Sequence, residues 1–214
     1  MAQVRHFRDA DKCTVHTLFT NGMKDNTNAL IWEAIKNVPG VKVSCLAVPT
    51  LALVGARSFR SSSGFTLLFT ALAAAAVPVA VAVTLWSSLM DYVSHSLNDD
   101  LNNILDFYKH PSAFWVAELN GEVVGCTALQ SHSADVAELR RMSVKAGMRR
   151  NGVAKMLGQT LIAHAKATGH KKVYLVTTSG QKPALALYKR LGWYETKVWQ
   201  SHGLTFHRLE LDLA

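Results

Sequence analysis

The stretch that decides the fold reads Glu138-Leu139-Arg140-Arg141-Met142-Ser143-Val144, then Lys145-Ala146-Gly147-Met148, then Arg149-Arg150-Asn151-Gly152-Val153-Ala154. Polar and apolar residues alternate over 138–144, which is typical of a β-strand. A basic turn that contains glycine follows, and a helical pattern begins near Gly152. The stretch therefore predicts a strand, a turn and the start of a helix.

The residues after Gly152 have the periodicity of an amphipathic helix. Apolar side chains recur every four residues, at Val153, Leu157, Leu161 and Ala165. The first amides of a helix have no partner within the helix and lie at the positive end of its dipole, and a glycine there lets an anion approach the backbone. Arg149 and Arg150 add positive charge. We therefore expect this turn to bind an anion of the size of a pyrophosphate.

Two motifs carry a resemblance to a known superfamily. Residues 149–154 have the form Arg-x-x-Gly-x-Ala, and residues 181–193 read Gln-Lys-Pro-Ala-Leu-Ala-Leu-Tyr-Lys-Arg-Leu-Gly-Trp. In this order and spacing they resemble the two motifs of the GNAT N-acetyltransferases, Gln/Arg-x-x-Gly-x-Gly/Ala and Asn-x-x-Ala-x-x-x-Tyr-x-x-x-Gly-Phe. The chain departs from the pattern at Gln181, where asparagine is usual, and at Arg150, where glycine is frequent.

The order of the expected elements is similar to that of the GNAT fold. Strands are expected at 3–7, 113–118, 122–129, 138–144, 172–177, 194–200 and 204–211, and helices at 9–23, 91–110, from 152 and at 183–192. Asn120-Gly121 marks the hairpin between the second and third strands. The resemblance implies an α/β (α+β) fold, in which helices flank a central mixed sheet.

A hydrophobic segment interrupts this order. No charged residue occurs over 43–56 or over 64–90, and Arg57 and Arg60 lie between the two runs. As a helix the second run would be about 40 Å long, enough to cross a ~30 Å hydrocarbon layer. We expect a membrane-embedded helical hairpin over 38–90, between catalytic segments 1–37 and 91–214; a buried hairpin in a soluble protein is the alternative.

The insertion narrows the resemblance to the camello-like or N-acetyltransferase 8 family. The residues over 138–144 and 152–157 are particularly similar to that group. Its members are enzymes of the endoplasmic reticulum membrane, so the resemblance implies this location. Lysines and arginines before the hairpin outnumber the two in its loop, which places both ends in the cytosol.

The composition narrows the choice of partners. The 214 residues carry a formal net charge of +8, which an anionic cofactor and an anionic membrane surface both explain. Nucleic acid is not expected as a partner, because the chain has neither a zinc-finger spacing nor a dense lysine tract. The three cysteines are scattered, so we expect neither a disulfide framework nor a metal site.

Acetyl transfer to an amine needs a base for the amine, a stabiliser for the carbonyl oxygen and a proton for the departing thiolate. Glu138 is the candidate base, and alternation places it on one face with Arg140, Met142 and Val144. A surface carboxylate paired with an arginine is the alternative reading. The resemblance implies that Tyr188 protonates the coenzyme thiolate, although its helical spacing also fits a core aromatic residue.

The resemblance also implies how acetyl-CoA is held. The backbone of Met142 and Val144 would bind the pantetheine arm and polarise the acetyl carbonyl. The pyrophosphate would lie on the amides of 149–154: Arg149, Arg150, Asn151, Gly152, Val153 and Ala154.

Basic residues near the strand bear on the acceptor. Arg140, Arg141 and Lys145 fit an acceptor with a carboxylate, or form a generic basic surface. The leading expectation is a membrane-bound N-acetyltransferase for the amine of a small amino-acid-like acceptor, a cysteine S-conjugate ahead of aspartate. Acetylation of protein lysines and an inactive membrane scaffold are the alternatives, and the sequence leaves the oligomeric state open.

Overall fold

The computed structural model describes residues 2–37 and 62–213, with side chains described in the second range from residue 76. Contacts divide the chain into two compact units. The first is Met1–Asn26, Asp91–Trp199 and Thr205–Ala214, and the second is Thr27–Met90 and Gln200–Leu204. The candidate site lies in the first unit. The domain limits expected from the sequence stay a prediction.

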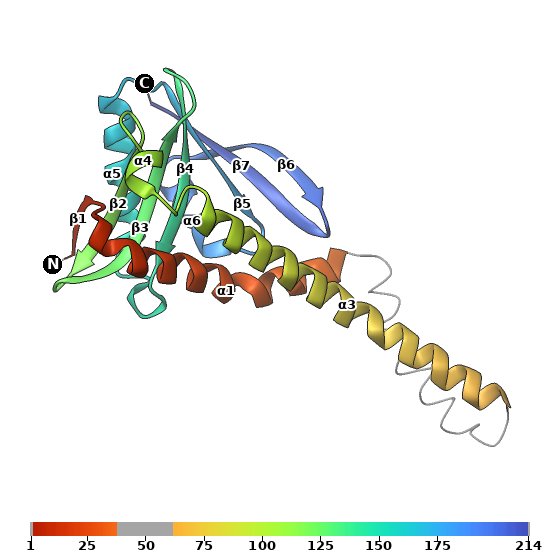
Figure 1. Cartoon of the computed structure of the whole chain (residues 1–214). Helices are drawn as coiled ribbons and strands as arrows, with labels where there is room; N and C mark the ends of the chain where they lie inside the picture. The colour runs from red at the N-terminus through yellow and green to blue at the C-terminus, as the bar shows by residue number, and fades with distance from the viewer. Residues whose placement is uncertain (1, 38–61, 214) are drawn as a thin grey trace. The chain divides into compact units, whose positions relative to one another are not determined.

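A seven-stranded sheet with the order β1-β2-β3-β4-β5-β7-β6 organises the chain (Figure 1). The pair β4–β5 is parallel, whereas β1–β2, β2–β3, β3–β4 and β5–β7 are antiparallel. The strands are Gln3–His6 (β1), Ala113–Leu119 (β2), Glu122–Ser131 (β3), Val136–Val144 (β4), Lys172–Thr178 (β5), Tyr194–Ser201 (β6) and Leu204–Asp212 (β7). All seven strands expected from the sequence are present, so the mixed sheet is confirmed.

The helices follow the expected order but not all the expected lengths. They are Lys12–Asn37 (α1), Ser62–Asn98 (α3), Ile104–Phe107 (α4), Val153–Ala167 (α5) and Lys182–Arg190 (α6), with 3-10 turns at Asp9–Asp11 and Ala146–Met148. The single helix expected over 91–110 is wrong. The helix ends at Asn98, and the carboxylate of Asp100 forms a buried ion pair with Arg141.

One face of the sheet is covered by α5 and α6. The helix α5 packs against β2, β3 and β4. Its expected apolar face is confirmed, because Val153, Leu157, Leu161 and Ala165 are all buried. They share a cluster with strand residues and with Tyr188 of α6. Burial of these side chains stabilises the helix against the sheet and fixes where it begins.

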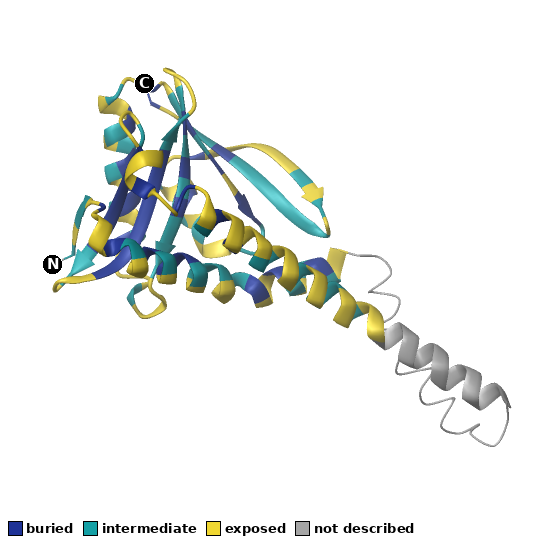
Figure 2. Ribbon diagram, in the orientation of Figure 1, coloured by how far each residue is buried: buried dark blue, intermediate teal, exposed yellow. Residues whose placement is uncertain are grey.

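The face of β2 opposite α5 is covered within the first unit by aromatic contacts. Phe7 and Tyr108 meet Phe114 of β2 at centroid distances of 5.5 and 5.4 Å. Both faces of β2 and β3 are therefore buried, as the dark blue strands in Figure 2 show. On the corresponding face of β4, β5 and β7, polar residues alternate with the core residues.

A β-bulge in β4 changes which face its residues occupy. Cys126 pairs with Ser143, whereas Ala128 pairs with Arg140, so β4 has one extra residue between them. Arg141 lies in this bulge with φ 56°, a left-handed conformation that is uncommon outside glycine. Met142 and Val144 consequently pack on the core that contains Leu139. The common face expected for Glu138, Met142 and Val144 is therefore wrong.

The helix α3 contains the apolar segment. Within the described residues one stretch, Ala76–Asn98, is long and apolar enough to cross a membrane, and only 6% of its most apolar window is buried. Val79 and Val83 are more than half exposed. The first arm and the loop of the expected hairpin lie outside the described residues.

Candidate functional site

The site is built where β4 and β5 stop pairing. The two parallel strands pair at Val136 with Lys172, Ala137 with Val173, and Glu138 with Tyr174. Beyond that point β4 runs to Val144 and β5 to Thr178 without pairing with each other. Strand edges that are not paired present free amide and carbonyl groups. The edge of β4 after Glu138 can therefore bind an extended ligand through its backbone.

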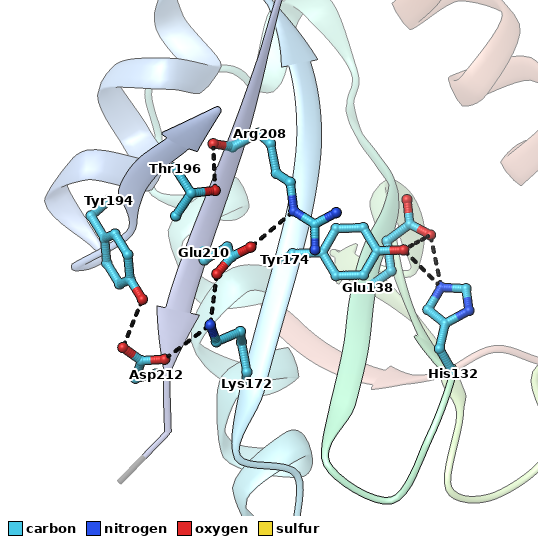
Figure 3. A network of polar contacts seen from close by, with 9 residues as sticks. All are labelled: His132, Glu138, Lys172, Tyr174, Tyr194, Thr196, Arg208, Glu210 and Asp212. Atoms are coloured by element: carbon cyan, nitrogen blue, oxygen red, sulfur yellow. Dashed lines mark hydrogen bonds and ion pairs between the residues drawn. The ribbon is translucent and has the colours of Figure 1, made fainter. Parts of the chain in front are cut away.

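Glu138 lies at the last pair and belongs to a polar network (Figure 3). Its Oε2 lies 3.0 Å from Nε2 of His132 and accepts a hydrogen bond from the Tyr174 hydroxyl at 3.3 Å. The Tyr174 hydroxyl is also 3.1 Å from His132 Nε2. The Glu138 side chain is 22% exposed, so it is accessible but held in place. This geometry suits a group that accepts a proton.

The two neighbouring arginines have different environments. Arg140 shares the face of Glu138 and donates from Nη1 to Gln130 Oε1 at 2.6 Å. The Arg141 side chain is instead buried against Asp100. Its Nε donates to Asp100 Oδ2 at 2.9 Å, and its side chain is only 3% exposed. Its guanidinium is thus already paired inside the protein, which makes Arg141 a structural residue and leaves Arg140 as the candidate for the acceptor.

The turn before α5 has the features of an anion site. Arg150 has φ 65° and Gly152 has φ 79°, so two left-handed residues lie close together at the start of the helix. Within the described residues the amides of Arg150, Asn151, Gly152, Val153 and Ala154 have no acceptor. Five free amides at the positive end of a helix are a concave donor set for a phosphate. The turn therefore fits the pyrophosphate of a coenzyme.

Arg149 is more constrained than the residues that follow it. Its amide donates to Ala146, its Nε to the carbonyl of Val144 at 3.1 Å, and its Nη2 to Asp25 at 2.6 Å. The Arg149 side chain is 43% exposed, so it still adds positive charge beside the turn. Arg150 and Asn151 are exposed, and a Cβ at Gly152 would meet no atom within 4 Å. The backbone at this turn is open to a ligand.

Tyr188 is buried in the core cluster between α6, α5 and the sheet. Burial raises the pKa of its hydroxyl above the ordinary value, which keeps the group protonated. Its ring lies 5.8 Å from that of Trp193, and no hydrogen-bond partner of the hydroxyl occurs in the described part of the chain. A protonated hydroxyl without a partner has its proton available for a ligand.

Several residues of this site have no signal in the sequence. His132 and Tyr174 meet Glu138 from a loop and from a neighbouring strand, and Arg208 of β7 lies 4.1 Å from the centroid of the Tyr174 ring. Tyr174 and Arg208 occupy ordinary alternating positions of predicted strands, so only strand pairing could have found them. No cluster of three or more potential metal ligands occurs in the described ranges.

Several known proteins are similar to this chain. The Acetyltransferase (GNAT) family matches residues 81–193, which is more than half of the chain. An N-acetyltransferase family 8 member 2 of Rattus norvegicus is 28% identical over 90% of this chain and 84% of its own length. A GNAT-family acetyltransferase structure from Staphylococcus aureus has a TM-score of 0.61 at 15% identity, and covers all of both chains.

N-acetylaspartate synthetases are also similar. The protein of Danio rerio is 39% identical over 57% of this chain and 45% of its own length. The protein of Homo sapiens is 30% identical over 89% of this chain and 61% of its own length. The chain thus spans about half to three fifths of the length of these synthetases.

Proposed function

The chain belongs to the Acetyltransferase (GNAT) family, and on that premise we propose that it transfers the acetyl group of acetyl-CoA to the primary amine of a small acceptor. The position of Glu138 carries this proposal. A half-buried carboxylate lies at the point where β4 leaves β5, and the same strand leads directly to the anion-binding turn. A base and a coenzyme site are thereby joined through one short stretch of chain.

The donor is held by backbone groups in this proposal. Acetyl-CoA supplies an activated thioester when it is bound. The free amides from Arg150 to Ala154 would hold its pyrophosphate, and the charge of Arg149 would assist. The unpaired edge of β4 at Met142 to Val144 would align the pantetheine arm and donate a hydrogen bond to the acetyl carbonyl oxygen. Their side chains pack in the core, which fixes this backbone.

Glu138 would receive the proton of the acceptor amine, directly or through water. An amine attacks only when it is neutral, so a nearby carboxylate that takes its proton accelerates the step. His132 and Tyr174 fix the orientation of this carboxylate through the contacts at 3.0 and 3.3 Å. A carboxylate held in this way needs little reorganisation when it acts.

Tyr188 would supply the proton for the leaving thiolate. Burial keeps its hydroxyl protonated, and the hydroxyl has no acceptor in the described part of the chain. Protonation of a departing thiolate prevents the reverse attack. The two proton transfers thus use different residues, on β4 and on α6.

The acceptor in this proposal is an amino-acid-like amine that carries a carboxylate. Arg140 shares the face of Glu138 and has guanidinium donors beyond its bond to Gln130. Cysteine S-conjugates and aspartate both fit, and the similarity to N-acetylaspartate synthetases supports aspartate. The chain covers only part of the length of those synthetases, so acetylation of aspartate by this chain is a part of the proposal.

We further propose that α3 anchors the enzyme in the endoplasmic reticulum membrane with the catalytic unit in the cytosol. The support is the exposed apolar stretch of α3. Trp86 is 43% exposed on this helix, and aromatic side chains are frequent at membrane interfaces.

Release of free CoA thiol from the full chain in detergent micelles tests the activity. S-benzyl-L-cysteine, L-aspartate and a lysine peptide would be offered with acetyl-CoA, and we expect release with the free amino acids. Release with the peptide alone would instead favour protein acetylation. Binding of acetyl-CoA without release for any acceptor would refute the proposal and favour a scaffold.

A further inference from the structure

A second guanidinium group lies beside the proposed base. Arg208 of β7 is placed over the ring of Tyr174, 4.1 Å from the centroid, and Tyr174 in turn donates to Glu138 (Figure 3). Arg208 Nε donates to Glu210 Oε1 at 2.9 Å. Its two Nη groups have no hydrogen-bond partner in the described part of the chain, and the side chain is 36% exposed.

We propose that Arg208 binds the carboxylate of the acceptor while the acceptor amine lies at Glu138. This inference rests on the proposed acetyl transfer to a carboxylate-bearing amine and adds the residue that would hold the carboxylate. Arg208 is then a residue that determines specificity, because it contacts the substrate away from the bond that forms.

The strand pairing explains why these residues meet. Glu138 pairs with Tyr174, and Tyr174 pairs with Glu210, two residues after Arg208. Residues two apart on a strand lie on the same face. Three strands therefore place a carboxylate, a tyrosine and a guanidinium in a row across one face of the sheet. A short amino acid can contact both ends of this row, because only a few bonds separate its amine from its carboxylate.

The guanidinium of Arg208 is prepared for a carboxylate. A planar guanidinium stacked on an aromatic ring keeps its orientation, and its two outer nitrogens can donate to both oxygens of a carboxylate. The hydrogen bond from Nε to Glu210 also holds the guanidinium in place and leaves its two outer nitrogens available. Lys172 also donates to Glu210, at 2.7 Å, so this carboxylate is shared between two cations and does not fully neutralise Arg208.

The electrostatics of Tyr174 agree with this arrangement. Burial and the carboxylate of Glu138 raise the pKa of its hydroxyl, while Arg208 and Arg140 oppose that shift. Both guanidinium groups therefore act on the space around the hydroxyl. An acceptor amine at Glu138 would lie near these cations, which favours a substrate with negative charge.

Matched pairs of acceptors test the inference. S-benzyl-L-cysteine is compared with S-benzylcysteamine, and S-methyl-L-cysteine with S-methylcysteamine; the second member of each pair lacks only the carboxylate. For Arg208→Gln we expect kcat/KM for the carboxylate-bearing member to fall about tenfold or more, the loss typical of one charge-assisted pair at a half-exposed site. The decarboxylated members should change by less than about twofold. For Arg208→Lys the loss in kcat/KM should be intermediate. Lysine keeps the charge but cannot donate from two nitrogens to both carboxylate oxygens.

Arg190→Gln is the matched control, because this exposed arginine of α6 has no interaction in the described part of the chain. It should leave all four acceptors unchanged. An equal loss for both members of each pair in Arg208→Gln would overturn the inference, and so would no loss for either. In both cases the acetyl transfer proposed above would stand.

Direct binding separates the two proposals. Calorimetry would measure the binding of S-benzyl-L-cysteine and of L-aspartate to the full chain in detergent with CoA present. Binding that Arg208→Gln weakens, without turnover in the unaltered chain, would support the anion site and refute the transferase proposal. If no carboxylate-bearing amine binds or reacts better than its decarboxylated partner, Arg208 is not the anchor.

Discussion

Asp100→Asn is the substitution with the largest expected effect on stability. The Asp100 side chain is fully buried, and its carboxylate accepts hydrogen bonds from both Arg141 and Tyr108. The amide side chain has nearly the same size but no charge. The change therefore leaves the Arg141 guanidinium buried without a counter-charge.

The magnitude follows from this burial. Breaking a buried ion pair by removing one partner costs about 3–5 kcal/mol. The Tyr92 hydroxyl still accepts from Arg141 at 3.0 Å, and the Phe19 ring lies 4.9 Å from the guanidinium, so the lower value is more appropriate. In a domain of this size ~1 kcal/mol shifts the melting temperature by about 2–4 °C. We expect a loss of about 6–12 °C.

Differential scanning fluorimetry of the full chain in detergent measures this shift. Glu122→Gln is the matched control, because it removes the same charge from an ion pair with Lys145 in which both side chains are about half exposed. Exposed pairs contribute about 0–1 kcal/mol, so its melting temperature should fall by less than about 4 °C. The double variant Asp100→Leu/Arg141→Met should recover more than half of the loss, since an apolar pair leaves no buried charge.

The pH dependence of the melting temperature tests whether the ion pair between Asp100 and Arg141 causes this loss. Burial alone would raise the pKa of Asp100, but the hydrogen bonds from Arg141 and Tyr108 outweigh it and lower the pKa below its ordinary value. A carboxyl with a lowered pKa in the folded state stabilises the fold above its unfolded pKa, and this contribution is lost as the pH falls through the folded pKa. The difference in melting temperature between the unaltered chain and Asp100→Asn should be constant above about pH 5. It should shrink below about pH 4. A melting temperature within about 2 °C of the unaltered chain at pH 7 would refute the structural role of the pair.

Three further substitutions test the proposed site. Glu138→Gln should lower kcat by about 10² to 10⁴-fold with little change in acetyl-CoA affinity, measured by single-turnover kinetics; a loss below about tenfold contradicts the base role. Tyr188→Phe should lower kcat by about 10²-fold and leave the melting temperature unchanged, and, because burial raises the pKa of Tyr188, the hydroxyl should cause no alkaline decline below about pH 9. Gly152→Val should cost about 1–2 kcal/mol of stability, because φ at this residue is 79°, and should weaken acetyl-CoA binding in calorimetry. Gly152→Asn is its control, since asparagine tolerates this conformation, and an equal loss for both would show that the backbone conformation does not matter.

Local signals predict most of the fold. Asn120-Gly121 gives the β2–β3 hairpin, and both residues have the positive φ that the turn requires. The apolar spacing from Val153 to Ala165 gives α5 and its buried face, and Gly192, with φ 90°, follows the end of α6. Each of these signals acts within one element, so no knowledge of the partners is needed.

The bulge in β4 shows where local reasoning fails. Strict alternation places Met142 and Val144 with Glu138, but the extra residue at Arg141 moves them to the core face. The same ion pair that anchors Arg141 also ends the helix before Asp100, which the polar pattern of 91–110 does not indicate. A contact between residues 41 positions apart thus decides two local conformations.

By itself the sequence determined the order of the elements and the family resemblance, and it predicted an anion-binding turn at Gly152 and two proton-transfer candidates. These depend on periodicity and on motifs that are contiguous in the chain. Only the tertiary structure decided that Arg141 supports the fold, that His132 and Tyr174 hold Glu138, and that Arg208 lies beside them. The reason is physical: strand pairing and buried charge pairs join residues far apart in the sequence, and their free energy depends on burial, which no local pattern encodes.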